Sequence, residues 1–142
     1  MKLENQVCSI EQGKRLKELG VTGSLFQYHS YLGGGWILEV VASGHIMFNN
    51  GVAEPIPSGR YIDTYPAYTV AELGAALPTG YGTQRLTDDV GEEFFRAYDD
   101  SGNEIMGCDY EFEAQSRAAM ITRLLETGTL TASEVNERTN NA

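Results

Sequence analysis

The stretch from Glu111 to Glu126 contains neither glycine nor proline, and its apolar residues recur at helical spacing. Those residues are Ala114, Ala118, Ile121 and Leu125. They form one apolar stripe that has to be buried, and Gly128 lies just past the end, where glycine often terminates a helix. The pattern therefore predicts a C-terminal helix. From Thr131 to Arg138 we expect only a frayed further turn.

Two more helices are indicated by their N-terminal signals. Ser9 and Gln12 have the spacing of a capping box, in which each side chain bonds the other residue's backbone N–H, and Gly20 is placed to end that helix. The segment Thr69–Glu72 has the same spacing, and Pro78 stops the helix that follows it. We therefore expect an N-terminal helix and a short middle helix.

The region between these helices has the composition of strands and turns. We expect strands near residues 25–31, 36–41, 45–48 and 60–65, with a tight turn at Asn49-Asn50-Gly51 and an irregular stretch at Pro55 and Pro57. Further on, a loop surrounds Tyr81, and Glu92–Tyr98 is expected to pair with residues 103–108 through the turn Asp99–Gly102.

These elements together predict an α+β fold. Short gaps between strands favour hairpins, so the sheet is expected to be mostly antiparallel, flanked by an N-terminal and a C-terminal helix, with a short middle helix. A chain of 142 residues fits one domain, here residues 1–142, with a polar tail from about residue 139.

The charge of the chain limits its partners. Twenty acidic against ten basic residues give a formal net charge of −10, which argues against binding a nucleic-acid backbone or an anionic membrane. The longest apolar stretch, Trp36–Ala42, is far shorter than the ~20 residues that a membrane helix needs, and Met1–Gln6 is polar. We therefore expect a cytoplasmic protein whose Cys8 and Cys108 are reduced, buried thiols.

The sequence offers little for catalysis or metal binding. Cys8, His29, His45 and Cys108 contain no closely spaced pair of zinc ligands, so no metal and no cofactor are expected. His29 or His45 with Asp63 could supply a general base, but no nucleophile motif accompanies them. We therefore assign no catalytic residue, and a small hydrolase remains the third hypothesis.

Aromatic residues concentrate between residues 28 and 81, with arginines beside them. Tyrosine and tryptophan offer flat faces for stacking, and arginine grips a phosphate with two parallel hydrogen bonds. The same residues also suit a sheet core or a subunit interface. The ligand-binding residues that we predict are Tyr28, Trp36, Arg60, Tyr61, Tyr65, Tyr68 and Arg85.

Three blocks occur in a fixed order along the chain. They are Ser9-x-Glu11-Gln12-x-Lys14-x-Leu16-Lys17-x-Leu19-Gly20-Val21, Ala67-Tyr68-Thr69-Val70-Ala71-Glu72-Leu73-Gly74, and Glu113-Ala114 followed by Arg117-Ala118-x-Met120. In these blocks the chain resembles a group of uncharacterised small proteins of phages and prophages, many of them from Bacteroidota. The resemblance implies a phage or prophage origin, and it supplies no activity. Small phage accessory proteins often counter host defences, some of them by trapping nucleotide immune signals.

Two binding hypotheses therefore precede the hydrolase. In the first, the chain is a non-enzymatic protein that sequesters a small nucleotide-like immune signal in the host cytoplasm, stacked on tyrosines and anchored by Arg60 or Arg85. Exposed aromatic residues would also favour a homo-oligomer. In the second, the acidic chain binds and inhibits a host protein through charge complementarity. The densest acidic pairs are Asp88-Asp89 and Glu92-Glu93.

Overall fold

The computed structural model describes residues 2–22, 24, 26–31, 36–40, 46–49, 52–55 and 61–140. A short 3-10 helix, Leu3–Asn5, precedes the helices α1 (Ile10–Glu18), α2 (Val70–Ala76), α3 (Glu113–Glu126) and α4 (Ala132–Asn140). The strands are β1 (Phe26–Tyr31), β2 (Trp36–Val40), β3 (Ile46–Asn49), β4 (Val52–Pro55), β5 (Tyr61–Pro66), β6 (Gly82–Thr87) and β7 (Glu93–Tyr98). The fold is α+β, with antiparallel strands flanked by N-terminal and C-terminal helices, as the sequence predicts.

The expected capping boxes are both present. The Ser9 hydroxyl accepts from the Gln12 backbone at 3.2 Å, while the Gln12 side chain accepts from the Ser9 N–H at 3.0 Å. Thr69 and Glu72 make the same reciprocal bonds at the start of α2. Each box satisfies N–H groups that a helix start leaves without partners, so both helix starts are confirmed.

The C-terminal region differs from the expectation. Thr131 and Glu134 form a third pair of reciprocal bonds, of 3.1 and 3.2 Å, and start the helix α4 where only a frayed turn was expected. Val135 and Thr139 are buried, so the predicted polar tail from residue 139 is also wrong for Thr139. The helix persists because it packs on α2, where Arg138 donates to the Ala76 carbonyl oxygen at 3.1 Å.

The larger sheet has the strand order β4-β3-β2-β1-β5, with every described neighbour antiparallel. Asn49 pairs with Val52, so β3 and β4 are two residues apart in the sequence, and Asn50 and Gly51 of the predicted tight turn lie outside the described residues. The strand β4 itself was not expected, because Pro55 was interpreted as irregular. Proline is tolerated at the end of an edge strand, and β4 is such an edge.

The second sheet is a hairpin of β6 and β7, and it corrects another expectation. Glu92–Tyr98 was predicted to pair with residues 103–108, whereas its partner along the whole strand is β6, for which no strand was predicted. Residues 103–110 do contact β7, through bridges of Glu104 with Tyr98 and of Tyr110 with Phe95, and through the Ile105 N–H, which donates to the Ala97 carbonyl oxygen at 2.9 Å. The predicted pairing with residues 103–108 is therefore present only at the end of β7. The turn after Asp99 is nevertheless present, because the Asp99 carboxylate accepts from the N–H groups of Ser101 and Asn103, both at 2.9 Å.

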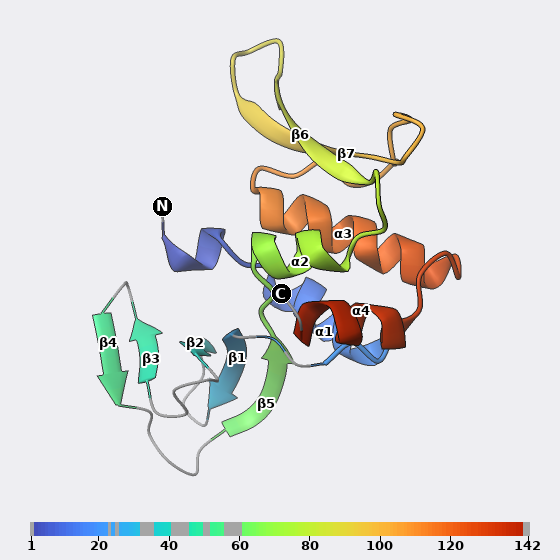
Figure 1. Ribbon diagram of the computed structural model, residues 1–142. Coiled ribbons are helices and arrows are strands. Elements are labelled where there is room, and N and C mark those ends of the chain that lie inside the picture. Colours follow the sequence, from blue (N-terminus) through green and yellow to red (C-terminus); the bar gives the residue numbers. More distant parts are fainter. Residues whose placement is uncertain are drawn as a thin grey trace.

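The helices lie between the two sheets (Figure 1). Helix α1 packs on β5 so closely that a Cβ at Gly13 would overlap the Pro66 carbonyl oxygen. Helix α3 packs on β7, and its buried residues join Leu16 of α1 and Leu73 of α2 in one apolar cluster. No helix in the described part of the chain is long and apolar enough to cross a membrane.

Candidate binding groove

The β6–β7 hairpin lies against the segment that leads into α3. The Phe95 N–H donates to the Tyr110 carbonyl oxygen at 2.7 Å, and the Tyr110 N–H donates back at 3.0 Å. Two residues later the chain turns into α3, which begins at Glu113 with Phe112 as its N-cap. The segment 109–112 therefore runs beside β7 only briefly, and a hollow opens where the two diverge.

This hollow is a cavity of about 850 Å³, within the range of small-ligand sites. We call it the acidic groove. Its walls come from the hairpin and from the segment before α3: Arg85, Asp88, Glu92, Glu93, Phe94, Phe95, Asp109, Tyr110, Glu111 and Phe112. Five carboxylates and four aromatic rings thus surround the space, with a single guanidinium among the lining residues.

The carboxylates of the acidic groove differ in how they are paired. Arg96 binds both oxygens of Asp109, at 3.1 and 2.9 Å, and also contacts Glu104 at 3.3 Å. The hydrogen bond to Asp109 raises the pKa of the Arg96 guanidinium, which therefore stays positively charged. The negative charge of Asp109 is therefore balanced by the guanidinium of Arg96.

The remaining acids have weaker partners. Arg85 reaches Glu93 only at 3.9 Å, and both side chains are mostly exposed, so this contact contributes little. Glu92 and Glu111 are exposed. Asp88 accepts from two backbone N–H groups of its own turn, at 3.0 and 2.9 Å, which leaves its negative charge in place. The groove therefore carries a negative field.

The rings of the acidic groove already contact cations. The Arg96 guanidinium lies 5.3 Å from the centre of the Phe94 ring, and the Arg85 guanidinium lies 5.8 Å from that of Phe95. A cation over an aromatic face is attracted by the ring quadrupole. Both faces of the hairpin are thus able to hold a positive group.

A second cavity of about 370 Å³ adjoins the acidic groove and shares Arg85, Phe95 and Phe112 with it. We call it the apolar pocket. Its other walls come from the N-terminal turn, β1, and the starts of α2 and α3: Leu3, Asn5, Gln6, Phe26, Thr69, Val70 and Glu113. The two cavities therefore share one wall, and the lining of the first is mainly charged while that of the second is mainly apolar.

One arginine fixes the hairpin to the helices behind this surface. Arg117 of α3 donates to the Val70 carbonyl oxygen at 2.9 Å and to the Thr83 hydroxyl at 3.3 Å, and it pairs with Glu113 at 3.0 Å. The guanidinium fills the space over Gly74, where a Cβ would overlap it. Arg117 therefore joins α2, β6 and the start of α3.

Of the predicted ligand-binding residues, Tyr28 and Tyr65 are directly paired between β1 and β5, whereas Arg85 lies on the separate β6–β7 hairpin. Tyr28 and Tyr68 are buried, and the Tyr28 hydroxyl donates to the Cys8 carbonyl oxygen at 2.7 Å. Tyr65 is half-buried, with the Lys17 amine 5.5 Å from the centre of its ring. Arg85 lies on the hairpin instead, over Phe95.

For the other three predicted residues, the structure does not describe the side chains. The backbones of Trp36 and Tyr61 belong to β2 and β5, and Arg60 lies outside the described residues. Their part in a binding site stays a prediction. The same holds for His45, and for the side chains of His29 and Asp63, on which the hydrolase hypothesis depends.

The two thiols lie in the interior. Cys8 and Cys108 are buried and free. Burial raises the pKa of Cys8 from its ordinary 9.0 to about 12, and it also raises the pKa of Cys108, so both thiols are protonated at neutral pH. Among the residues described, no group of three potential metal ligands is assembled.

The aromatic residues of the acidic groove were missed by sequence reasoning, although a signal exists. In Glu92-Glu93-Phe94-Phe95 and in Asp109-Tyr110-Glu111-Phe112, acids and rings are adjacent or alternate. The predicted ligand site was based on tyrosines with arginines beside them, and these acid-rich segments do not have that pattern. Their proximity also depends on the bridge between Phe95 and Tyr110, which sequence spacing does not reveal.

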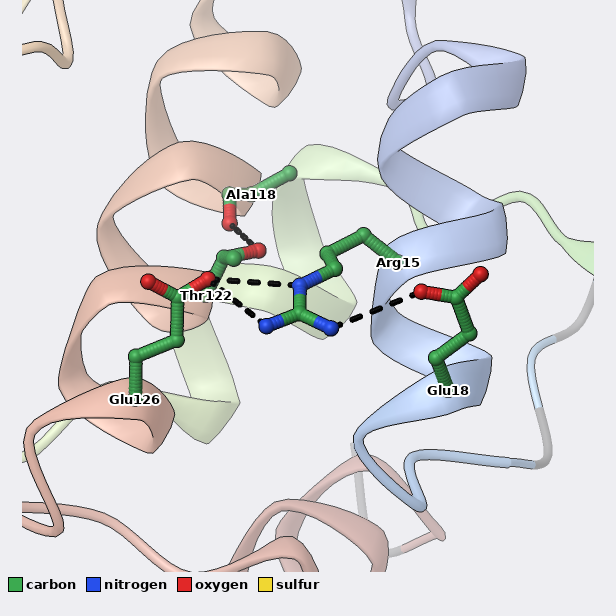
Figure 2. Close-up of polar contacts among 5 residues, drawn as sticks. All are labelled: Arg15, Glu18, Ala118, Thr122 and Glu126. Carbon is green, nitrogen blue, oxygen red and sulfur yellow. Dashed lines mark hydrogen bonds and ion pairs between the residues drawn. The ribbon is translucent and has the colours of Figure 1, made fainter.

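Another cleft, of about 300 Å³, lies between α1, α3 and residues 106–110. Figure 2 shows the guanidinium of Arg15 between the two helices, 3.3 Å from Glu126 and 3.4 Å from Glu18. We call these three residues the α1–α3 seam. Its arginine already has two carboxylate partners, so the seam is a structural contact and a weaker binding candidate than the acidic groove.

No protein-family model, no curated protein and no solved structure matches the chain.

Proposed function

We propose that this chain is a non-catalytic binding protein that captures a positively charged segment of a partner protein in the acidic groove. The observation that carries the proposal is the cavity of about 850 Å³ whose walls hold five carboxylates and four aromatic rings. Capture needs affinity alone, so the proposal assigns no catalytic residue.

Charge decides the class of occupant. A carboxylate about 4 Å from an arginine or lysine is attracted by roughly 4 kcal/mol at the effective dielectric of a protein surface, before desolvation is subtracted. A phosphate placed among the same carboxylates is repelled. Aromatic faces add about 0.5–1 kcal/mol for each stacked cation. A basic segment therefore fits the groove better than a nucleotide does.

The apolar pocket adds a second requirement. Because it adjoins the acidic groove through Phe95 and Phe112, one occupant can reach both cavities. A buried aliphatic side chain contributes roughly 1.5–3 kcal/mol. The partner segment in this proposal therefore combines basic residues with at least one apolar residue.

The biological setting is also part of the proposal. The resemblance to phage and prophage proteins makes a host protein the partner, bound and inhibited in the host cytoplasm during infection. A second copy of the chain is a poorer occupant, because it carries the same charge of −10. The homo-oligomer expected from exposed aromatic residues stays a prediction, which sedimentation of the purified protein checks.

Sequestration of a nucleotide signal also stays a prediction. Because Tyr28 and Tyr68 are buried, it now depends on the remaining predicted residues, Trp36, Arg60, Tyr61, Tyr65 and Arg85. The test of the proposed function therefore includes nucleotides as a separate arm.

The test is calorimetric titration of the protein with a short peptide of alternating arginine and valine. The peptide is expected to bind, and a peptide with glutamate in place of arginine is not. The triple variant Glu92→Gln, Glu93→Gln, Glu111→Gln is expected to weaken binding by about tenfold or more.

The matched control removes three exposed acids elsewhere, with Glu11→Gln, Asp100→Asn and Glu137→Gln. It changes the net charge equally and is expected to retain most of the affinity. Equal weakening by both triple variants, or no binding of the basic peptide, would contradict the proposal. Heat released on adding cyclic or linear nucleotides would favour the nucleotide hypothesis instead.

A further inference from the structure

The two edges of β7 are occupied differently. In an antiparallel ladder, hydrogen-bonded and non-hydrogen-bonded pairs alternate. The Asp88 N–H donates to the Glu92 carbonyl oxygen at 2.9 Å, which continues the β6–β7 ladder and places the bonded pairs at Phe94 and Arg96. The backbone groups of Glu93, Phe95 and Ala97 consequently point to the opposite edge.

That opposite edge is filled over only part of its length. Phe95 exchanges two hydrogen bonds with Tyr110, and the Ala97 carbonyl oxygen accepts from the Ile105 N–H at 2.9 Å. At Glu93 the neighbouring chain has already turned toward α3. Within the described residues no backbone hydrogen bond from residues 103–112 reaches the Glu93 N–H or carbonyl oxygen at this edge, and Glu93 lines the acidic groove. One place of a third strand is therefore vacant beside Glu93.

The two faces of this edge differ in chemistry. Successive side chains of a strand point to opposite faces. On one face lie Glu92, Phe94 and Arg96, and the contact of Arg96 with Asp109 puts Asp109 and Glu111 there too. On the other face lie Glu93 and Phe95 with Arg85, which continues into the apolar pocket together with Phe112. One face is thus acidic and the other mainly apolar.

We propose that the partner segment binds as an extended strand that adds to the β7 edge at Glu93, with basic side chains on the acidic face and apolar side chains toward the apolar pocket. This inference rests on the proposed function and specifies its ligand. Main-chain hydrogen bonds supply affinity in such strand addition, while alternating side chains supply selectivity. The recognised pattern is therefore an alternation of basic and apolar residues.

Three peptides of equal charge separate this mode from charge attraction alone. The first alternates arginine and valine. The second has the same composition in two blocks, and the third is the alternating peptide methylated on every second backbone nitrogen, made in both phases. The alternating peptide is expected to bind about tenfold more tightly than the block peptide and than at least one methylated form.

The outcomes keep the two proposals apart. If no basic peptide binds, the proposed function fails. If alternating, block and methylated peptides bind equally, the proposed function stands and the strand addition is overturned. Hydrogen exchange gives the second readout: the Glu93 amide is expected to slow at least tenfold with the alternating peptide. Slowing at Thr83, Arg85 and Thr87 instead would move the ligand to the outer edge of β6 and contradict the inference.

Discussion

The α1–α3 seam and the acidic groove are both charged, yet they use charge in opposite ways. In the seam Arg15 has two carboxylate partners, and the three side chains join two helices (Figure 2). In the groove the carboxylates outnumber the lining guanidinium five to one. Paired charges close a contact within the chain, whereas an excess of one sign leaves attraction available to another molecule.

The buried thiol of Cys8, just before α1, gives the largest expected effect, because burial opposes its ionisation. Cys8 is fully buried, and burial raises its pKa from 9.0 to about 12. A raised folded-state pKa gives stability that is complete below pH 9 and is lost as the pH rises toward 12, up to about 4 kcal/mol. Between those pH values the free energy of unfolding of the Cys8→Ala variant is expected to fall less than that of the natural chain. Denaturant unfolding at several pH values measures both. Identical pH profiles would show that the thiol does not titrate with unfolding.

The close packing of α1 gives the next effect. In Gly13→Ala the new Cβ overlaps the Pro66 carbonyl oxygen, so α1 has to move away from β5. We expect a net loss of about 2–3 kcal/mol, despite a gain of up to about 1 kcal/mol in helix propensity. Thermal unfolding measures it. Gly82→Ala is the control, because nothing lies within 4 Å of its Cβ. A stabilised Gly13→Ala variant would mean that the helix is packed less closely.

The third effect compares the stability contributed by a paired arginine, Arg117, with that of an exposed one, Arg85. Arg117→Met leaves the Val70 carbonyl oxygen and Glu113 without their partner, at an expected cost of about 2 kcal/mol. Arg85→Met removes an exposed guanidinium and is expected to change the free energy of unfolding by less than about 0.5 kcal/mol. Equal effects of the two variants on denaturant unfolding would remove the distinction between paired and exposed arginines.

The smallest effect compares the two kinds of carboxylate directly. Glu126→Gln weakens the seam and is expected to cost about 0.5 kcal/mol at low salt. Glu93→Gln in the groove is expected to cost nothing, because the guanidinium of Arg85, with which Glu93 pairs, is 3.9 Å away and exposed. The difference between the two losses of stability should vanish in high salt. A larger loss for Glu93→Gln would show that the groove acids stabilise the fold.

Local signals predicted the helices well, and long-range pairing was the part that they did not predict. Ser9 with Gln12, and Thr69 with Glu72, lie close in sequence, so their capping bonds follow from spacing. The pairing of β6 with β7 was not predicted, and residues 103–108 pair with β7 only near its end, at Ala97 and Tyr98. The helix α4 depends on packing against α2, which its own weak apolar stripe did not indicate.

The site was harder to predict than the fold for a related reason. Aromatic residues serve cores and binding sites equally, and Tyr28 and Tyr68 proved to be core. The acidic groove combines residues 85–95 with residues 109–112, which meet only through the bridge of Phe95 and Tyr110. The net charge of −10 is the part of the composition that agrees with the proposed basic partner, which stays a prediction.

Backbone amide shifts of the isotope-labelled protein, recorded during titration with the alternating arginine–valine peptide, test the central claim most directly. The largest shifts are expected at Glu92–Phe95 and Glu111–Phe112, with the α1–α3 seam unchanged. Shifts centred on Arg15 and Glu126, or on the strands β1 to β5, would contradict the assignment of the acidic groove as the binding site.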